Sequence, residues 1–254
     1  MATYKKRGYK PKTKKEKEEV VEENSTTAEV FNTLDEGASK TEEWVVKNQK
    51  YIIGVIGAIA LVVLCYLGYN KIVAEPKAKD AMNEMYTAKK YFDDAVSGVS
   101  SDSLYNMALN GGEGKYGMLD IINEYGGSPA ANLANYYAGM SYLNLKDYQN
   151  AVTYLSDFSS DDKMLGPIAK GGIGDAFVQL EQNEDALEYY IKAFNANVND
   201  FTTPLYLMKA ARVAIDLGQN EKALGYLKRI KSEFSTSTEA TQADVLIGKV
   251  EASL

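Results

Sequence analysis

Residues 51–69 read YIIGVIGAIALVVLCYLGY, nineteen consecutive positions without a charged side chain. At a rise of about 1.5 Å per residue, an α-helix of this length nearly matches the roughly 30 Å hydrocarbon core of a bilayer. Tyrosine rings, which favour the membrane–water interface, lie toward its ends at Tyr51, Tyr66 and Tyr69. The stretch therefore predicts a transmembrane helix over 46–70.

Two other roles for this stretch are less favoured. The core helix of a soluble domain is usually shorter and interrupted by polar residues. A cleaved signal peptide is disfavoured because fifty residues precede the stretch and no small-x-small cleavage site follows it. Leu64 precedes Cys65, where a bacterial lipoprotein signal has a small residue, and Gly54, Gly57 and Gly68 form no GxxxG pair. We therefore expect an uncleaved membrane anchor.

The charge differs on the two sides of the span. Residues 1–50 carry 11 basic and 10 acidic side chains, whereas residues 71–254 carry 17 basic and 25 acidic ones. An acidic domain argues against a nucleic-acid partner. The chain has no histidine, the commonest general base and metal ligand, and its one cysteine excludes an internal disulfide.

The tail, 1–45, has few large apolar residues to offset the entropy of ordering it. We expect it to be a disordered cytoplasmic tail, with helix beginning near Thr41. Its first 17 residues, MATYKKRGYKPKTKKEK, contain eight Lys or Arg. They form either a solvated topogenic segment or a contact for anionic lipid, ribosome or RNA. By the positive-inside rule they predict a cytoplasmic N-terminus and a domain on the other side of the membrane.

The domain, 71–254, shows a repeating pattern of small residues. One set recurs at spacings of 34, 35 and 37, at Gly117, Ala151, Ala186 and Ala223. A second set stands twelve positions before the last three of these, at Gly139, Gly174 and Ala211. A further position, three residues after the second set, is bulky in two cases of three, at Tyr142, Phe177 and Ala214. Antiparallel helices pack closely where one side chain is Gly or Ala, so the pattern predicts repeated helix pairs.

These offsets resemble the tetratricopeptide repeat, whose period is 34. The expected fold class is all-α, a single transmembrane helix followed by a tetratricopeptide-repeat α-solenoid. The expected repeats span about 115–129, 130–163, 167–200 and 204–236, followed by a capping helix over 238–252. Their helices are expected at 115–125, 130–144, 148–158, 167–181, 184–195, 204–217 and 221–234. The helix expected over 75–97 serves as the first helix of repeat one, displaced by an insertion over 98–114.

Two helix ends carry recognisable signals. Gly218 is expected to terminate the helix before it, because glycine readily adopts a left-handed conformation. Thr236 and Glu239 resemble a capping box at the start of the last helix.

The layout of tail, span, long helix and repeats ending KRIKSEFSTSTEATQADVLIGKVEA at 228–252 resembles the ancillary SecYEG translocon subunit family (YfgM-like). Repeat phrases such as Ile121-Ile122-Asn123-Glu124-Tyr125 add to this resemblance. It implies a single-pass protein of the bacterial inner membrane with a periplasmic repeat domain. Translocon subunits or exported polypeptides are the implied partners. The alternative is a scaffold for another envelope or cell-division complex that binds no client chains.

The sequence contains no recognisable catalytic constellation. Gly171-Gly172-Ile173-Gly174 lacks the Lys-Ser/Thr of a phosphate loop and follows no predicted strand. The carboxylates of Asp161-Asp162 and Glu184-Asp185 are expected in a loop and at a helix start, where the helix dipole favours them, rather than as metal ligands. We expect no enzyme activity, cofactor or metal, and a hydrolase is the remote alternative.

The resemblance implies a concave partner-binding face. In the repeat family it is lined by positions two, five, nine, twelve and thirteen of the first helix of each pair. Here these positions hold Leu133, Tyr136, Met140, Leu143 and Asn144, then Ile168, Gly171, Asp175, Val178 and Gln179, then Leu205, Met208, Arg212, Ile215 and Asp216. The candidate partner-binding residues are Tyr136, Met140, Asn144, Asp175, Gln179, Met208, Arg212 and Asp216. Tyr136 and Met140 replace the Lys and Asn of carboxylate clamps, so such a clamp is not expected. The alternative is that many of these residues are buried against one another or against the 75–97 helix.

Overall fold

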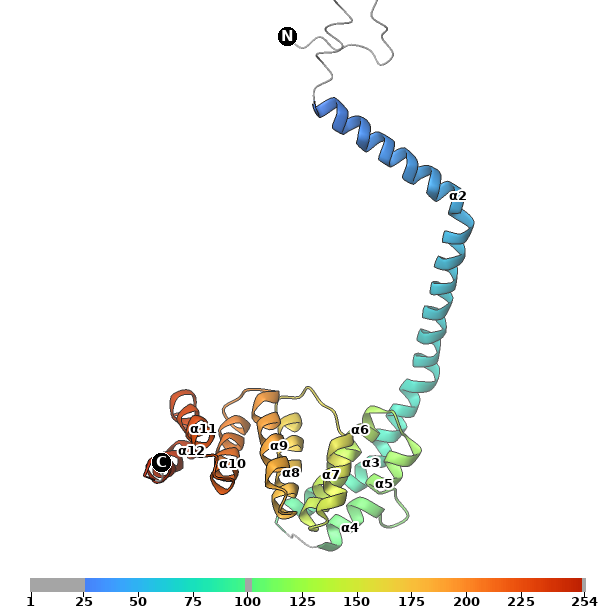
Figure 1. Cartoon of the computed structure of the whole chain (residues 1–254). Coiled ribbons are helices and arrows are strands. Elements are labelled where there is room, and N and C mark those ends of the chain that lie inside the picture. Colours follow the sequence, from blue (N-terminus) through green and yellow to red (C-terminus); the bar gives the residue numbers. More distant parts are fainter. Residues whose placement is uncertain (1–25, 99–101, 253–254) are drawn as a thin grey trace, which may run out of the picture. The chain divides into compact units, whose positions relative to one another are not determined.

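The computed structural model of the chain describes residues 26–98 and 102–252, with side chains from residue 43 onward (Figure 1). All regular elements in these ranges are helices, apart from an isolated β-bridge between Gly112 and Lys115. The expected all-α class is therefore confirmed. The chain separates into two compact units whose boundary falls after Tyr69.

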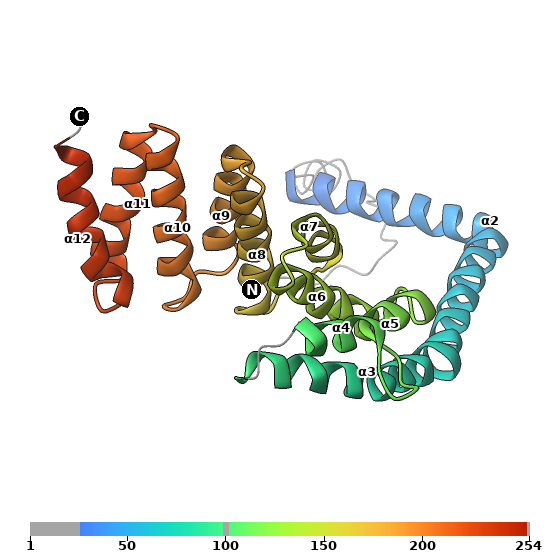
Figure 2. The same cartoon turned by 90° about the horizontal axis from the view of Figure 1, so that it is seen from below.

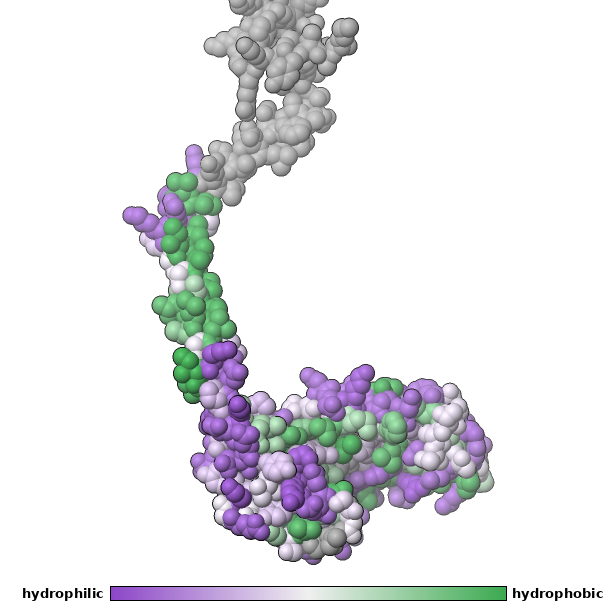
Figure 3. Space-filling model, turned by 180° about the vertical axis from the view of Figure 1, so that it is seen from behind, coloured by the Kyte–Doolittle hydropathy of each residue, from purple (hydrophilic) through white to green (hydrophobic). Residues whose placement is uncertain are grey.

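The first unit contains one long helix, α2 (Thr26–Tyr69). By length and composition, its C-terminal part is apolar enough to cross a membrane. Ten large apolar side chains between Ile53 and Leu67 are 48–69% exposed, and Figure 3 shows them as a hydrophobic band along the helix. The helix starts upstream of the predicted Thr41, so the expected disorder does not hold for 26–40. Prolines break helices, and the sequence has none between Pro11 and Pro76. The rest of the predicted tail, 1–25, lies outside the described residues.

The second unit opens with a π-helical turn, η1 (Asn70–Ala74), and three helices, α3 (Glu75–Val96), α4 (Asp102–Asn110) and α5 (Met118–Glu124). The predicted helix over 75–97 is therefore present. The insertion contains α4, which buries Tyr105, Ala108 and Leu109.

Three helix pairs and a last helix follow. In chain order they are α6 (Pro129–Asn144), α7 (Tyr148–Asp157), α8 (Leu165–Gln179), α9 (Asn183–Ala196), α10 (Thr202–Asp216), α11 (Asn220–Glu233) and α12 (Thr238–Glu251). Each lies within two residues of its predicted ends. Figure 2 shows α8 to α12 side by side in a row, as expected for a solenoid. We call α6, α8 and α10 the A helices and α7, α9 and α11 the B helices.

The small residues lie where helices approach most closely. Ala151, Ala186 and Ala223 are each the fourth residue of a B helix and are fully buried. A Cβ on Gly139 would lie 2.5 Å from Leu155, and one on Gly174 would lie 2.6 Å from the Tyr190 ring. These contacts confirm the phase predicted for the last three repeats.

The first repeat departs from the predicted phase. Gly117 is not a counterpart of Ala151, because it precedes α5 as its N-cap residue. A Cβ there would lie 2.2 Å from the carbonyl oxygen of Leu109, so backbone approach, not helix pairing, requires this glycine. The fourth residue of α5 is Ile121, which is fully buried with Met85 of α3 in one core cluster.

The turns between A and B helices share one geometry. The residue after each C-cap has a positive φ, 64° at Lys146, 61° at Glu181 and 69° at Gly218. In each turn the next backbone N–H reaches back to the carbonyl of Tyr142, Phe177 or Ala214, at 2.7–2.9 Å. This is the Schellman pattern, and it confirms the predicted role of Gly218. The predicted cap at Thr236 is one residue early, because Ser237 Oγ accepts the 3.3 Å bond from Ala240 N.

Candidate functional site

Two of the eight candidate groove residues are buried. Tyr136 on α6 is 8% exposed, and its ring centroid lies 5.2 Å from that of Phe158. Burial raises the pKa of Tyr136 to about 12. Met208 on α10 is 4% exposed and belongs to the core formed by α9 to α12. The expectation that these two side chains line an open groove is therefore wrong, and the packing alternative applies to them.

The close approach of neighbouring A helices explains this burial. Tyr136, Gly171 and Met208 occupy position five of the three A helices, and all three are buried. A Cβ on Gly171 would lie 2.0 Å from the ring of Tyr206 on α10. Position five therefore faces the adjacent repeat. The same contact shows that Gly171 has a packing role, as the repeat pattern predicted for Gly174.

Four of the candidates are exposed polar residues near the C-terminal ends of A helices. They are Asn144, Gln179, Arg212 and Asp216. The Arg212 Nη2 atom donates a 2.9 Å hydrogen bond to Gln242 Oε1 on α12, and Gln179 Oε1 accepts one of 3.3 Å from the Tyr148 hydroxyl. Asn144 Nδ2 donates to the carbonyl of Met140, which is half-buried. These four, which we call the A-helix end residues, place polar groups at the surface near the ends of the A helices.

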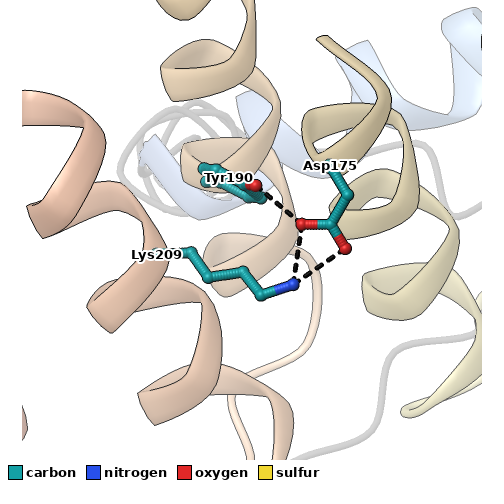
Figure 4. A network of polar contacts seen from close by, with 3 residues as sticks. All are labelled: Asp175, Tyr190 and Lys209. Carbon is teal, nitrogen blue, oxygen red and sulfur yellow. Dashed lines mark hydrogen bonds and ion pairs between the residues drawn. The ribbon is translucent and has the colours of Figure 1, made fainter. Parts of the chain in front are cut away.

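The last two candidates, Met140 on α6 and Asp175 on α8, are half-buried. Asp175 is the centre of a polar network (Figure 4). Its Oδ1 accepts a 2.7 Å hydrogen bond from the Tyr190 hydroxyl on α9, and its two oxygens lie 2.7 and 2.8 Å from Lys209 Nζ on α10. About a third of the Asp175 and Lys209 side chains is exposed, 34% and 33%. Lys209 Nζ also lies 5.7 Å from the ring centroid of Tyr206.

The raised pKa of Tyr190 determines which group donates the hydrogen bond to Asp175. Burial, and next the charge of Asp175, raise the pKa of Tyr190, so its hydroxyl remains a donor at neutral pH. Sequence reasoning found Asp175 but missed Tyr190 and Lys209. The repeat pattern did not point to Lys209, because the residue equivalent to Asp175 in the next repeat is Arg212, 37 residues further on. The network joins three helices and two repeats, so we assign it a structural role.

Metal binding has no candidate site among the described residues, since no group of three His, Cys, Asp or Glu side chains there is placed to hold an ion.

Comparison with known families identifies the helix pairs. The tetratricopeptide repeat family matches residues 133–161, within α6, α7 and the loop after them, and residues 206–237, within α10, α11 and the loop after them. The domain is a tetratricopeptide-repeat solenoid. No curated protein matches the chain significantly. Tetratricopeptide repeats are protein–protein interaction modules and are generally non-enzymatic scaffolds, so the domain is a protein-interaction module.

Proposed function

We propose that the chain is a membrane-anchored interaction module of the bacterial inner membrane, with its tetratricopeptide-repeat domain in the periplasm beside the Sec protein-export channel. Membrane anchoring is supported by the exposed apolar surface of α2, where ten large side chains are 48–69% exposed. Burial of one such side chain is worth about 1.5–3 kcal/mol. A surface of this kind is not stable in water, whereas a bilayer covers it on all sides.

The orientation rests on charge. The eight basic residues among the first 17 favour a cytoplasmic N-terminus, and residues 71–254 carry more acidic than basic side chains. The location beside the export channel rests on the resemblance of the whole layout to the ancillary translocon subunits.

The kind of partner follows from the concave face. An unfolded client needs an open apolar groove, but Tyr136 and Met208 are in the core and polar A-helix end residues remain. A polar surface fits a folded partner with complementary hydrogen-bonding groups. We therefore favour a translocon subunit over an exported, unfolded polypeptide. The competing function is a scaffold for another envelope or cell-division complex.

Site-specific photocrosslinking in native membranes tests this function. A photoreactive residue at Arg212 or Asp216 is expected to capture a subunit of the export channel, identified by mass spectrometry. The same residue at Ser156, exposed on the B helix α7, is the control and is expected to capture much less. Capture of cell-division or other envelope components without channel subunits would support the scaffold instead.

Two single substitutions separate binding from packing. Arg212→Ala is expected to weaken partner capture while the melting midpoint stays unchanged, because this side chain is exposed. Tyr136→Ala is expected to lower the melting midpoint, because it removes a buried ring and leaves a cavity. If the Arg212→Ala variant captures the partner as well as the unaltered chain does, the A-helix end residues are not the partner-binding surface.

A further inference from the structure

The loops that link successive repeats lie along one edge of the solenoid. Figure 1 shows the α7–α8 and α9–α10 connections passing along this edge. We define the inter-repeat edge as residues 157–164, 197–201 and 233–239, that is, the loops after α7, α9 and α11 with the last residues of α7 and α11 and the first of α12.

Asparagine side chains bind these loops to one another. Asn197 Nδ2 donates to the carbonyl of Asp161 at 3.3 Å, and Asn199 Nδ2 donates to the carbonyl of Lys163 at 3.0 Å. Asn199 Oδ1 also accepts from the backbone N–H groups of Phe201 and Thr202, at 2.9 and 2.8 Å. The backbones of the loops after α7 and α9 are therefore held together before any partner binds, which lowers the entropy lost on binding.

Large apolar side chains project from this ordered backbone. Phe201 is 77% exposed, Val198 is 61% exposed and Met164 is 40% exposed. Phe201 borders a hollow of about 390 Å³ that is also lined by Asp200, Glu233 and the segment 234–239. An exposed aromatic ring on an ordered loop contributes little to folding, but contributes strongly to binding when a partner covers it.

The charge around these side chains is negative. Asp157, Asp161, Asp200 and Glu233 are exposed along the edge, whose three segments contain one basic residue, Lys163. Of these four acids, only Glu233 forms an ion pair within the part of the chain that the structure describes, with Arg229. Such a surface repels anionic lipid and nucleic acid, and also the acidic domain of a second copy.

We propose that the inter-repeat edge docks a polypeptide segment that carries a Lys or Arg next to a large apolar residue. The apolar residue covers Phe201 and Val198, and the cation enters the hollow beside Asp200 and Glu233. The inference rests on the proposed function in that the domain binds protein, and it adds a second binding surface with a defined partner chemistry. Electrostatic attraction increases the association rate, and burial of Phe201 supplies the affinity.

Peptide binding to the full-length chain in zwitterionic nanodiscs tests the proposal. The probe is a fluorescent 14-residue peptide of alternating Lys-Leu and Lys-Phe pairs, and the control peptide has Glu in place of Lys. Phe201→Ala is expected to weaken probe binding about tenfold, and Asp200→Asn about threefold. The matched control variants are Tyr86→Ala and Asp94→Asn on α3, which remove another exposed aromatic ring and another exposed acid. They are expected to leave affinity within about twofold.

Each other result has a defined meaning. Equal binding of the Glu peptide, unchanged affinity in Phe201→Ala with an unchanged melting midpoint, or equal losses in the α3 controls would overturn the proposal. Much tighter probe binding by a chain lacking residues 1–17 would show that the basic tail occupies the edge, and would overturn the proposed topology as well. If these assays reject the inter-repeat edge as a binding surface but Arg212 still crosslinks to channel subunits, the proposed function stands without this second surface.

Discussion

Lys209 follows Asp175 by 34 residues, and its ammonium group lies 2.7 and 2.8 Å from the two carboxylate oxygens of Asp175. The pair joins adjacent A helices, α8 and α10, and the Tyr190 hydroxyl adds the intervening B helix at 2.7 Å. One carboxylate thus connects three consecutive helices. Beside it, the ring of Tyr206 packs on Gly171, so the same interface combines a polar network with close backbone packing.

This ion pair is expected to stabilise the domain modestly. Both side chains are about one-third exposed, so solvent screens their attraction. A double-mutant cycle with Asp175→Asn and Lys209→Met is expected to give a coupling energy of about 1 kcal/mol. The control cycle at Glu188 and Lys192, a more exposed i,i+4 pair on α9, is expected to give about 0.3–0.5 kcal/mol. A coupling energy no larger than that of the control would exclude a special role for this pair.

The domain is expected to lose stability in alkali. Burial is the largest cause that raises the pKa of Tyr190 and Tyr206, and it raises that of Tyr136 to about 12. The pKa of tyrosine in the unfolded chain is about 10. The contribution of these buried, protonated tyrosines to the free energy of unfolding is therefore complete below pH 10 and is lost as pH rises toward 12. Urea unfolding midpoints at pH 7, 9, 10.5 and 11.5 measure the effect.

Tyr136→Phe isolates one of these residues. It removes the titrating hydroxyl and keeps the buried ring, so the decline of stability above pH 10 is expected to become shallower. Tyr86→Phe, at a ring that is 69% exposed, is the control and is expected to leave the pH profile unchanged. If both variants show the same dependence of stability on pH above pH 10, burial of Tyr136 does not contribute to the alkaline loss of stability.

The turns between A and B helices are expected to accept glycine. Lys146 and Glu181 have φ values of 64° and 61°, a left-handed conformation that is unfavourable for residues with a Cβ. Lys146→Gly and Glu181→Gly are each expected to stabilise the domain by about 0.5–1 kcal/mol. Gly218→Ala, at the equivalent turn, is expected to destabilise it by about 1 kcal/mol. Thermal or urea unfolding checks all three, and destabilisation by either glycine would contradict the shared turn geometry.

The sequence predicted the helix pairs because their signals are local. Small residues mark the close approaches of helices, and Pro129, Pro167 and Pro204 each lie in the first turn of an A helix. The left-handed turns at Lys146 and Glu181 carried no such signal, because neither residue is the glycine that usually marks them. Gly117 had the expected spacing but a different role, since spacing does not show which backbone segment lies beside a glycine.

The candidate site was predicted less well. Family positions indicate which face of an A helix points toward the groove, but not how closely the next repeat approaches. That distance depends on the packing of Tyr206 on Gly171, 35 residues away, which buries position five. The inter-repeat edge was missed because the exposure of Phe201 depends on the loop geometry that Asn199 fixes through hydrogen bonds across two repeats.

Gly171 is expected to be intolerant of any side chain. A Cβ there would lie 2.0 Å from the buried Tyr206 ring, so Gly171→Ala is expected to destabilise the domain by about 1–3 kcal/mol through overpacking. Gly225→Ala on α11 is the control, because nothing lies within 4 Å of a Cβ there. It is expected to stabilise the helix by about 0.5–1 kcal/mol. In combination with Tyr206→Leu, Gly171→Ala should cost less than it does alone, and strict additivity would exclude the contact as the cause.

The topology is expected to place the tail in the cytoplasm and the repeat domain in the periplasm. Cys65 is the only cysteine, so Cys65→Ala gives a background for single-cysteine labelling. In this background, Ser156→Cys on the exposed surface of α7 should react with a membrane-impermeant maleimide on intact spheroplasts. Thr13→Cys in the basic tail should react only after the membrane is permeabilised, because positively charged segments are retained on the cytoplasmic side. The reverse pattern would overturn the periplasmic assignment, and labelling of both sites without permeabilisation would show that α2 does not cross the membrane.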